Sequence, residues 1–196
     1  MGSIITGMIQ ISAKDREAQQ ARLTARNNQA QVSYKEYLDK ELEIVNRAFD
    51  LIGSCISASD DLISVTQDEF DAEDPANSKN KKAIIEQQQA VVGKFNETDQ
   101  KWRIEENKIG LLMSYYHHNQ SEVASGWQHT QEEVGKYMDC AYDLYKIRLK
   151  GEDIPPDRYK ACELQKQALA TRLSELNKSL IAARKFIWEE EIDKNP

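Results

Sequence analysis

The three histidines, at positions 117, 118 and 129, are the side chains best suited to bind a metal ion, because they lie close together in the sequence. Adjacent histidines on a regular helix point about 100° apart, so His117 and His118 cannot ligate one ion from the same helix. A helical metal pair needs ligands three or four positions apart; His118 with Glu122 has this spacing, and His129 could approach through the turn. We expect no metal site and interpret the histidines as a polar helix end.

Paired carboxylates could catalyse hydrolysis if they lay in a cleft that shifted their pKa values. The acidic runs at residues 60–61, 68–74 and 189–191 fall in expected loops or terminal turns, where solvated charge is the usual state. The sequence also lacks the Glu-x-x-His repeats of di-metal bundles and the glycine-rich loops that bind phosphate. It therefore predicts neither catalytic residues nor a cofactor.

The cysteines are Cys55, Cys140 and Cys162, an odd number without CxxC spacing. Each lies among apolar residues, so we expect buried free thiols, which favour a reducing compartment. A nucleophilic Cys140, helped by Asp139 and His129, is the alternative. Reactive thiols lie in electropositive, partly exposed places, whereas Cys140 falls on an apolar stripe.

The first six residues, MGSIIT, fit the consensus for N-terminal myristoylation. This pattern is short and often occurs by chance, and no polybasic patch follows to supply a second membrane signal. We therefore do not expect acylation. The N-terminus also lacks the charged and apolar regions of a Sec signal peptide, and no run of 18 apolar residues predicts a transmembrane helix.

Composition indicates which elements carry these residues. The chain of 196 residues has 30% charged residues but only 8 Gly and 4 Pro, which is typical of long helices and not of a sheet protein with frequent turns. The net charge of −7 argues against a nucleic-acid binder, which would need clustered Lys and Arg. The densest basic stretch, residues 79–82, has no interleaved aromatic residue, and we interpret it as a solvated helix start.

Heptad-like apolar spacing predicts four long helices. The first carries an apolar stripe from residue 38 to 56. Gly and Ser accumulate at 53–60 and weaken the helix there, so this is a soft point where a kink or break could form. An acidic loop follows at 68–78. The second begins after Ser78 and fades near 118. The stripes of these two helices are Leu38, Leu42, Val45, Phe49, Ile52 and Ile56, then Ile84, Val91, Phe95, Trp102, Ile109, Leu112 and Tyr116.

The third helix is expected to run from about 130 to 149, because Thr130 and Glu133 match a capping box and Gly151 can end a helix. The last helix begins at Pro155-Pro156 and has the most regular stripe of the chain. The stripes of these helices are Val134, Tyr137, Cys140, Leu144 and Ile147, then Leu169, Leu173, Leu176, Leu180, Ala183 and Ile187.

The N-terminal residues 1–31 differ from the rest of the chain. We expect residues 1–11 to be loosely ordered and Ser12 to cap a helix. From 13 to 31 the sequence favours a helix but offers only Leu23 and scattered alanines for burial. We expect a segment that another chain orders on contact; the alternative is a solvent-exposed extension of the first helix with no role. Arg16, Arg22 and Arg26 are candidates for pairing with acidic groups on another chain. We place the bundle domain at residues 32–196.

Much of the aromatic content gathers near the expected junction of the last three helices, at Tyr115, Tyr116, Trp127, Tyr137, Tyr142, Tyr145 and Tyr159. Trp127 is the strongest candidate for a partner anchor, because it follows Gly126 in what we expect to be a non-helical link. Tyr115 and Tyr116 are further candidates. The alternative is a core in which these rings pack together.

The sequence thus predicts an all-α bundle of about four long, largely antiparallel amphipathic helices with coiled-coil-like packing. It favours a non-enzymatic interaction or assembly protein, such as a secretion or phage component, an inhibitor, an immunity-type protein or an effector that engages a protein target. Its partner would be another protein or a second copy of the chain. A small enzyme or metal-dependent protein with its site at residues 115–142 is the alternative, but no convergent polar cluster supports it. We expect a cytoplasmic protein or one exported without a Sec signal peptide.

Overall fold

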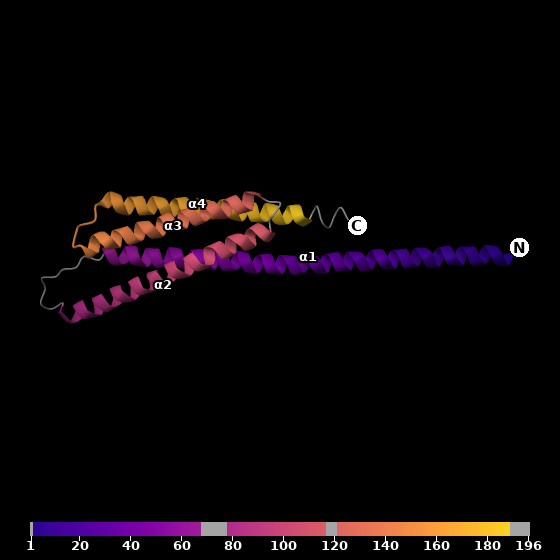
Figure 1. Ribbon diagram of the computed structural model, residues 1–196, viewed down its shortest axis with the longest axis horizontal. Helices are drawn as coiled ribbons and strands as arrows, with labels where there is room; N and C mark the ends of the chain where they lie inside the picture. The colour runs from indigo at the N-terminus through magenta and orange to yellow at the C-terminus, as the bar shows by residue number, and fades with distance from the viewer. Residues whose placement is uncertain (1, 68–77, 117–120, 189–196) are drawn as a thin grey trace. The chain divides into compact units, whose positions relative to one another are not determined.

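Four long α-helices make up the described part of the chain (Figure 1). They are α1 (Gly2–Gln67), α2 (Ser78–Tyr116), α3 (Ser121–Leu149) and α4 (Pro156–Trp188). The computed structural model describes residues 2–67, 78–116 and 121–188, and side chains within 17–29, 31–66, 85–115 and 121–186. No strand occurs in these residues, so the predicted all-α class is confirmed.

The chain divides into two compact units, residues 1–42 with 184–196, and residues 43–183. The division places residues 32–42 and 184–196 with the N-terminal segment, whereas the sequence suggested a bundle domain from 32 to 196. The second unit contains parts of all four helices, and successive helices in it run in opposite directions, as Figure 1 shows. It is the unit that holds most of the hydrophobic core.

The core of residues 43–183 combines large apolar side chains with a face of small ones on α1. Ala48, Cys55, Ala58 and Ser59 are all buried there, and small side chains let neighbouring helices approach closely. Leu42, in contrast, was expected on the buried stripe and is exposed. The buried face of α1 is therefore rotated from the predicted stripe towards these small residues. The larger core side chains are Val45, Leu51, Ile52, Leu62, Phe95, Trp102, Ile109, Met113, Val123, Trp127, Val134, Tyr137, Met138, Leu144, Leu169, Leu176 and Leu180.

Several helix ends agree with the sequence. The second and last helices begin at Ser78 and Pro156 as predicted, and Gly151 has φ 73°, the left-handed conformation that closes α3. The Gly151 amide donates to the Arg148 carbonyl at 2.9 Å, and the Glu152 amide donates to the Ile147 carbonyl at 3.3 Å. These bonds satisfy carbonyls that the end of α3 would otherwise leave open.

Other predicted boundaries were wrong. α1 begins at Gly2 and not at Ser12, and it runs through residues 53–60 without a break. α3 begins at Ser121, so Thr130 lies inside a helix and does not cap one. Its buried hydroxyl donates to the Gly126 carbonyl at 2.8 Å, the intrahelical bond that Thr forms when no free amide is available. Of the loop predicted at 68–78, residues 68–77 lie outside the described residues, and Ser78 is the first residue of α2.

Candidate functional site

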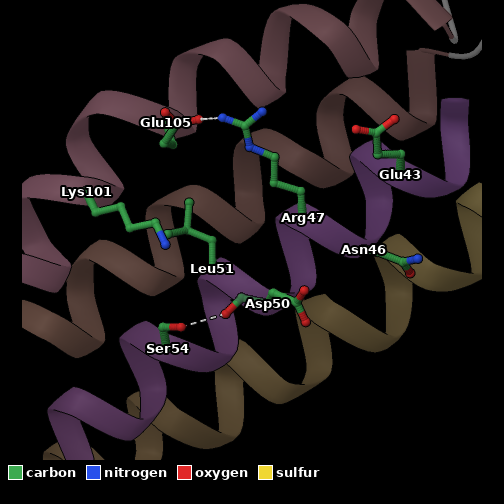
Figure 2. A pocket seen from close by; sticks show the side chains of 8 residues that line it. All are labelled: Glu43, Asn46, Arg47, Asp50, Leu51, Ser54, Lys101 and Glu105. Atoms are coloured by element: carbon green, nitrogen blue, oxygen red, sulfur yellow. Dashed lines mark hydrogen bonds and ion pairs between the residues drawn. The ribbon is translucent and has the colours of Figure 1, made fainter.

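A surface hollow in residues 43–183 lies between α1 and α2 (Figure 2). We call it the α1–α2 hollow; its volume is about 430 Å³. Seven of its eight lining residues are polar by type, and they include three carboxylates and two cations. They are Glu43, Asn46, Arg47, Asp50, Leu51, Ser54, Lys101 and Glu105.

Two charged groups of the α1–α2 hollow, Arg47 and Glu105, form an ion pair within the chain. Arg47 forms an ion pair with Glu105 across the two helices, which Figure 2 shows, and Lys108 approaches the other Glu105 oxygen at 3.2 Å. The hydrogen bond from Lys108 and the charge of Arg47 hold the pKa of Glu105 below its ordinary value. Glu105 therefore stays ionised at neutral pH and cannot act as a general acid. The hollow is suited to pairing with charged side chains and not to proton transfer.

The second hollow, the α1–α3–α4 hollow, has a volume of about 360 Å³. Carboxylates, hydroxyls and one ammonium group line it, together with a disulfide sulfur. Its lining residues are Asp60, Ile63, Ser64, Tyr137, Tyr159, Lys160, Cys162 and Glu163.

Asp60 on α1 is the centre of a polar network at this hollow. The Tyr137 hydroxyl on α3 donates to Asp60, and the Lys166 ammonium on α4 lies 2.9 and 2.8 Å from the two carboxylate oxygens. Burial, followed by the hydrogen bond to Asp60, raises the pKa of Tyr137 well above its ordinary value. Tyr137 thus remains a protonated donor and not a base. The sequence did not indicate this network, which connects three helices.

Tyr159 forms a separate contact between α4 and α1 at the same hollow. Its hydroxyl donates to the Thr66 carbonyl at 3.0 Å and lies 3.2 Å from the Thr66 hydroxyl. The Thr66 hydroxyl in turn donates to the Ile63 carbonyl at 2.6 Å. These bonds are used to hold helices together, so the hydroxyls do not converge on a point where a substrate atom could react.

The expectation of three free cysteines is wrong. Cys140 and Cys162 form a disulfide with an S–S distance of 2.01 Å, whereas three free thiols were expected. Cys55 alone among the three is free, and it is buried. Since Cys140 is bonded to Cys162, it is not a nucleophile, and the preference for a reducing compartment loses its basis.

Trp127 lies inside α3 and is 2% exposed, so the expectation of a non-helical link is wrong. Its ring contacts that of Trp102 with centroids 6.2 Å apart. The packing supports the alternative that the sequence left open, a core residue. Tyr115 is different, because 74% of it is exposed on α2. The side chain of Tyr116 lies outside the described residues.

The expected aromatic cluster is dispersed in the structure. Tyr142 stacks on Phe95 with centroids 5.9 Å apart and also lies beside Tyr145. Tyr137 and Tyr159 instead donate hydrogen bonds to α1. The described aromatic side chains from 115 to 142 therefore form no single surface.

The N-terminal candidates lie on a solvent-exposed part of α1. Every described side chain from 17 to 33 is exposed, including Arg22 and Arg26. The side chain of Arg16 lies outside the described residues. Nearer residue 42, the buried Glu41 carboxylate accepts a hydrogen bond from Nε of Arg184 at 2.7 Å, and Tyr34 donates to the Arg184 carbonyl. Burial raises the pKa of Tyr34.

Among the described side chains, no group of three His, Cys, Asp or Glu residues could hold a metal ion. His117 and His118 lie outside the described residues. In the described part of the chain, no helix is long and apolar enough to cross a bilayer. Fold and sites together define an all-α helical bundle whose polar clusters connect its own helices. No family model, curated protein or solved structure matches the chain.

Proposed function

We propose that the chain is a non-enzymatic interaction or assembly protein, and that residues 17–33 of α1 are the surface through which it contacts another protein. The observation that carries this proposal is the exposure of every described side chain in that stretch. At 1.5 Å per residue the stretch is a rod of about 25 Å.

Residues 17–33 belong to the continuous helix α1, but this stretch buries none of its described side chains. Its two large apolar side chains, Leu23 and Val32, are 50% and 57% exposed. Isolated helices of about 15 residues are marginal, and most helices in proteins gain their stability by burying an apolar face. Contact with another protein would supply that burial, and the alanines at 18, 21 and 25 would allow close approach of a second helix.

The charge of the segment favours an acidic partner surface. Residues 17–33 contain Arg22 and Arg26 and one acidic residue, Glu17, whereas the whole chain has a net charge of −7. Opposite charge speeds association and sets orientation, although exposed pairs add little affinity. A second copy of this acidic chain and a different acidic protein both satisfy this requirement.

The polar hollows support a binding role over an enzymatic one. In the α1–α2 hollow Glu105 is paired with Arg47 and Lys108, and at the α1–α3–α4 hollow Asp60 is held by Tyr137 and Lys166. Catalysis needs a nucleophile or base aimed at an open position, and neither group is available for that role.

Removing residues 1–31 tests the proposal. The truncated chain should keep the thermal unfolding midpoint of the remainder. It should lose self-association, measured by sedimentation equilibrium, or lose binding to the proteins that cross-link to the full chain in its own cells. A full-length control, Arg22→Glu with Arg26→Glu, keeps the helix-forming residues and reverses the charge. It should weaken the same association and leave helix content unchanged. If the truncation and the charge reversal both leave every association unaltered, the proposal is wrong.

A further inference from the structure

The disulfide links the third helix to the fourth, with each cysteine inside its helix. The Cα atoms of Cys140 and Cys162 are 5.6 Å apart, a usual separation for bonded cysteines. Gly151, whose positive φ ends α3, lies midway between them in the sequence. The bond therefore joins two antiparallel helices at equal distances from their turn.

We propose that this bond is a permanent structural link, which the chain acquires by thiol–disulfide exchange, and that the protein therefore matures in an oxidising compartment. Disulfides persist in oxidising compartments and are rare where glutathione and thioredoxin keep thiols reduced. The proposal concerns where and how the chain folds, and it does not depend on the partner.

The surroundings of the bond indicate a structural role. Tyr137 precedes Cys140 by three positions on α3, and Lys166 follows Cys162 by four on α4, so each shares a helix face with its cysteine. Both side chains donate to Asp60 on α1. The disulfide thus fixes the two helices that supply the donors to one carboxylate, and the covalent link and the polar network together connect three helices.

Burial makes the formed bond difficult to attack. Cys162 is 1% exposed, and Cys140 is partly buried. Redox-sensing cysteines are accessible and lie near cations that stabilise the thiolate. The burial of Cys162 does not match that pattern.

The third cysteine does not compete for pairing. Cys55 is also 1% exposed, and burial, followed by the nearby Asp99 and Glu106, raises the pKa of its thiol to about 12. Exchange requires a thiolate, so at neutral pH Cys55 is almost inert in the folded chain. The pairing of Cys140 with Cys162 is thereby favoured over the two pairings that would include Cys55.

The exchange is balanced in two steps, with a protein or small-molecule disulfide as the oxidant. The Cys140 thiolate attacks one sulfur of the oxidant, forms a mixed disulfide and releases a first oxidant thiolate. The Cys162 thiolate then attacks the Cys140 sulfur and displaces the second. The cysteine pair loses two electrons and two protons, and the oxidant leaves as two thiols.

Alkylation with iodoacetamide followed by intact-mass measurement tests the proposal on the full chain, taken from its own cells with thiols trapped at once. In denaturant without reductant, one thiol should react, and three should react after reduction. A Cys55→Ala control should show none without reductant. If three thiols of the natural protein react without reductant, maturation in an oxidising compartment is contradicted.

A second measurement separates a structural link from a reversible switch. Closing a loop of 22 residues predicts that the Cys140→Ala, Cys162→Ala double variant unfolds with an equilibrium constant roughly 300-fold larger. The bond should also survive incubation of the folded protein in a glutathione buffer of cytosolic potential. Unchanged stability of the double variant, or reduction of the bond while the protein stays folded, would overturn the structural role.

Discussion

Gly110 on α2 offers a test of how α2 and α3 pack, because it lies against the buried indole of Trp127. A Cβ atom at Gly110 would lie 3.0 Å from Nε1 and 3.2 Å from Cδ1 of that ring, closer than ordinary van der Waals contact. The ring has little room to withdraw, since it is 2% exposed and packs against Trp102. Gly110→Ala should therefore strain the core.

The magnitude follows from two opposing effects. Forcing an extra methyl group into a packed core costs about 1–3 kcal/mol. Replacing a glycine within a helix by alanine returns about 1 kcal/mol. Gly135→Ala on α3 is a matched control, because an added Cβ there meets nothing within 4 Å and only the helix-forming gain remains.

Guanidinium unfolding followed by far-UV circular dichroism measures both variants. We expect Gly135→Ala to be more stable than the natural chain by about 1 kcal/mol. Gly110→Ala should be less stable than Gly135→Ala by about 1–3 kcal/mol, with an unchanged denaturant slope. If the two variants are equally stable, the Trp127 indole does not pack on Gly110 and the α2–α3 contact described here is incorrect.

Three further predictions concern buried side chains. Leu176→Asp should cost several kcal/mol, because Leu176 has no exposed surface and the carboxylate would be buried without compensation; an unchanged melting temperature would contradict the core position. Trp127→Ala should lower the free energy of unfolding by about 3–5 kcal/mol, while the folded fraction should still bind the partner. A stable variant that no longer binds would instead show that Trp127 is a partner anchor. Arg184→Met removes the guanidinium that balances the buried Glu41 carboxylate, and it should lower the free energy of unfolding by about 3–5 kcal/mol. Faster amide exchange at residues 34–41 would report this loss. Unaltered exchange would show that the ion pair contributes little.

The regular apolar stripes allowed much of the fold to be predicted. α4 is the clearest case, because Leu169, Leu176 and Leu180 recur at heptad spacing and are all buried. Proline at the start of α4 and Gly151 after α3 are local signals whose effect does not depend on tertiary contacts. These features were therefore readable from single residues and their spacing.

The buried face of α1 was harder to predict. Ser59 contributed to the predicted soft point in the helix, yet Ser59 and its small neighbour Ala58 are both buried. Small side chains give no apolar signal of their own, and only the neighbouring helices show that close approach requires them. The position of Thr130 was also predicted wrongly, because a hydroxyl that can cap a helix can equally donate to a carbonyl of the preceding turn.

The polar sites were the hardest features to predict from the sequence, because their residues come from distant segments of the chain. The pairing of Cys140 with Cys162 had one sequence signal, since the two lie symmetrically about Gly151, and residues at equal distances from the turn of a helical hairpin lie side by side. The Asp60 network had none, because its donors Tyr137 and Lys166 come from other helices.

Amide hydrogen exchange at residues 17–33 tests the central claim, that this stretch of α1 is a contact surface for another protein. In the dilute, monomeric chain these amides should exchange rapidly, because their exposed side chains give the helix little support. In the self-associated chain or in complex with a partner, the same amides should become protected while those of residues 43–183 change little. Strong protection of residues 17–33 in the monomer, or none in any complex, would contradict the account.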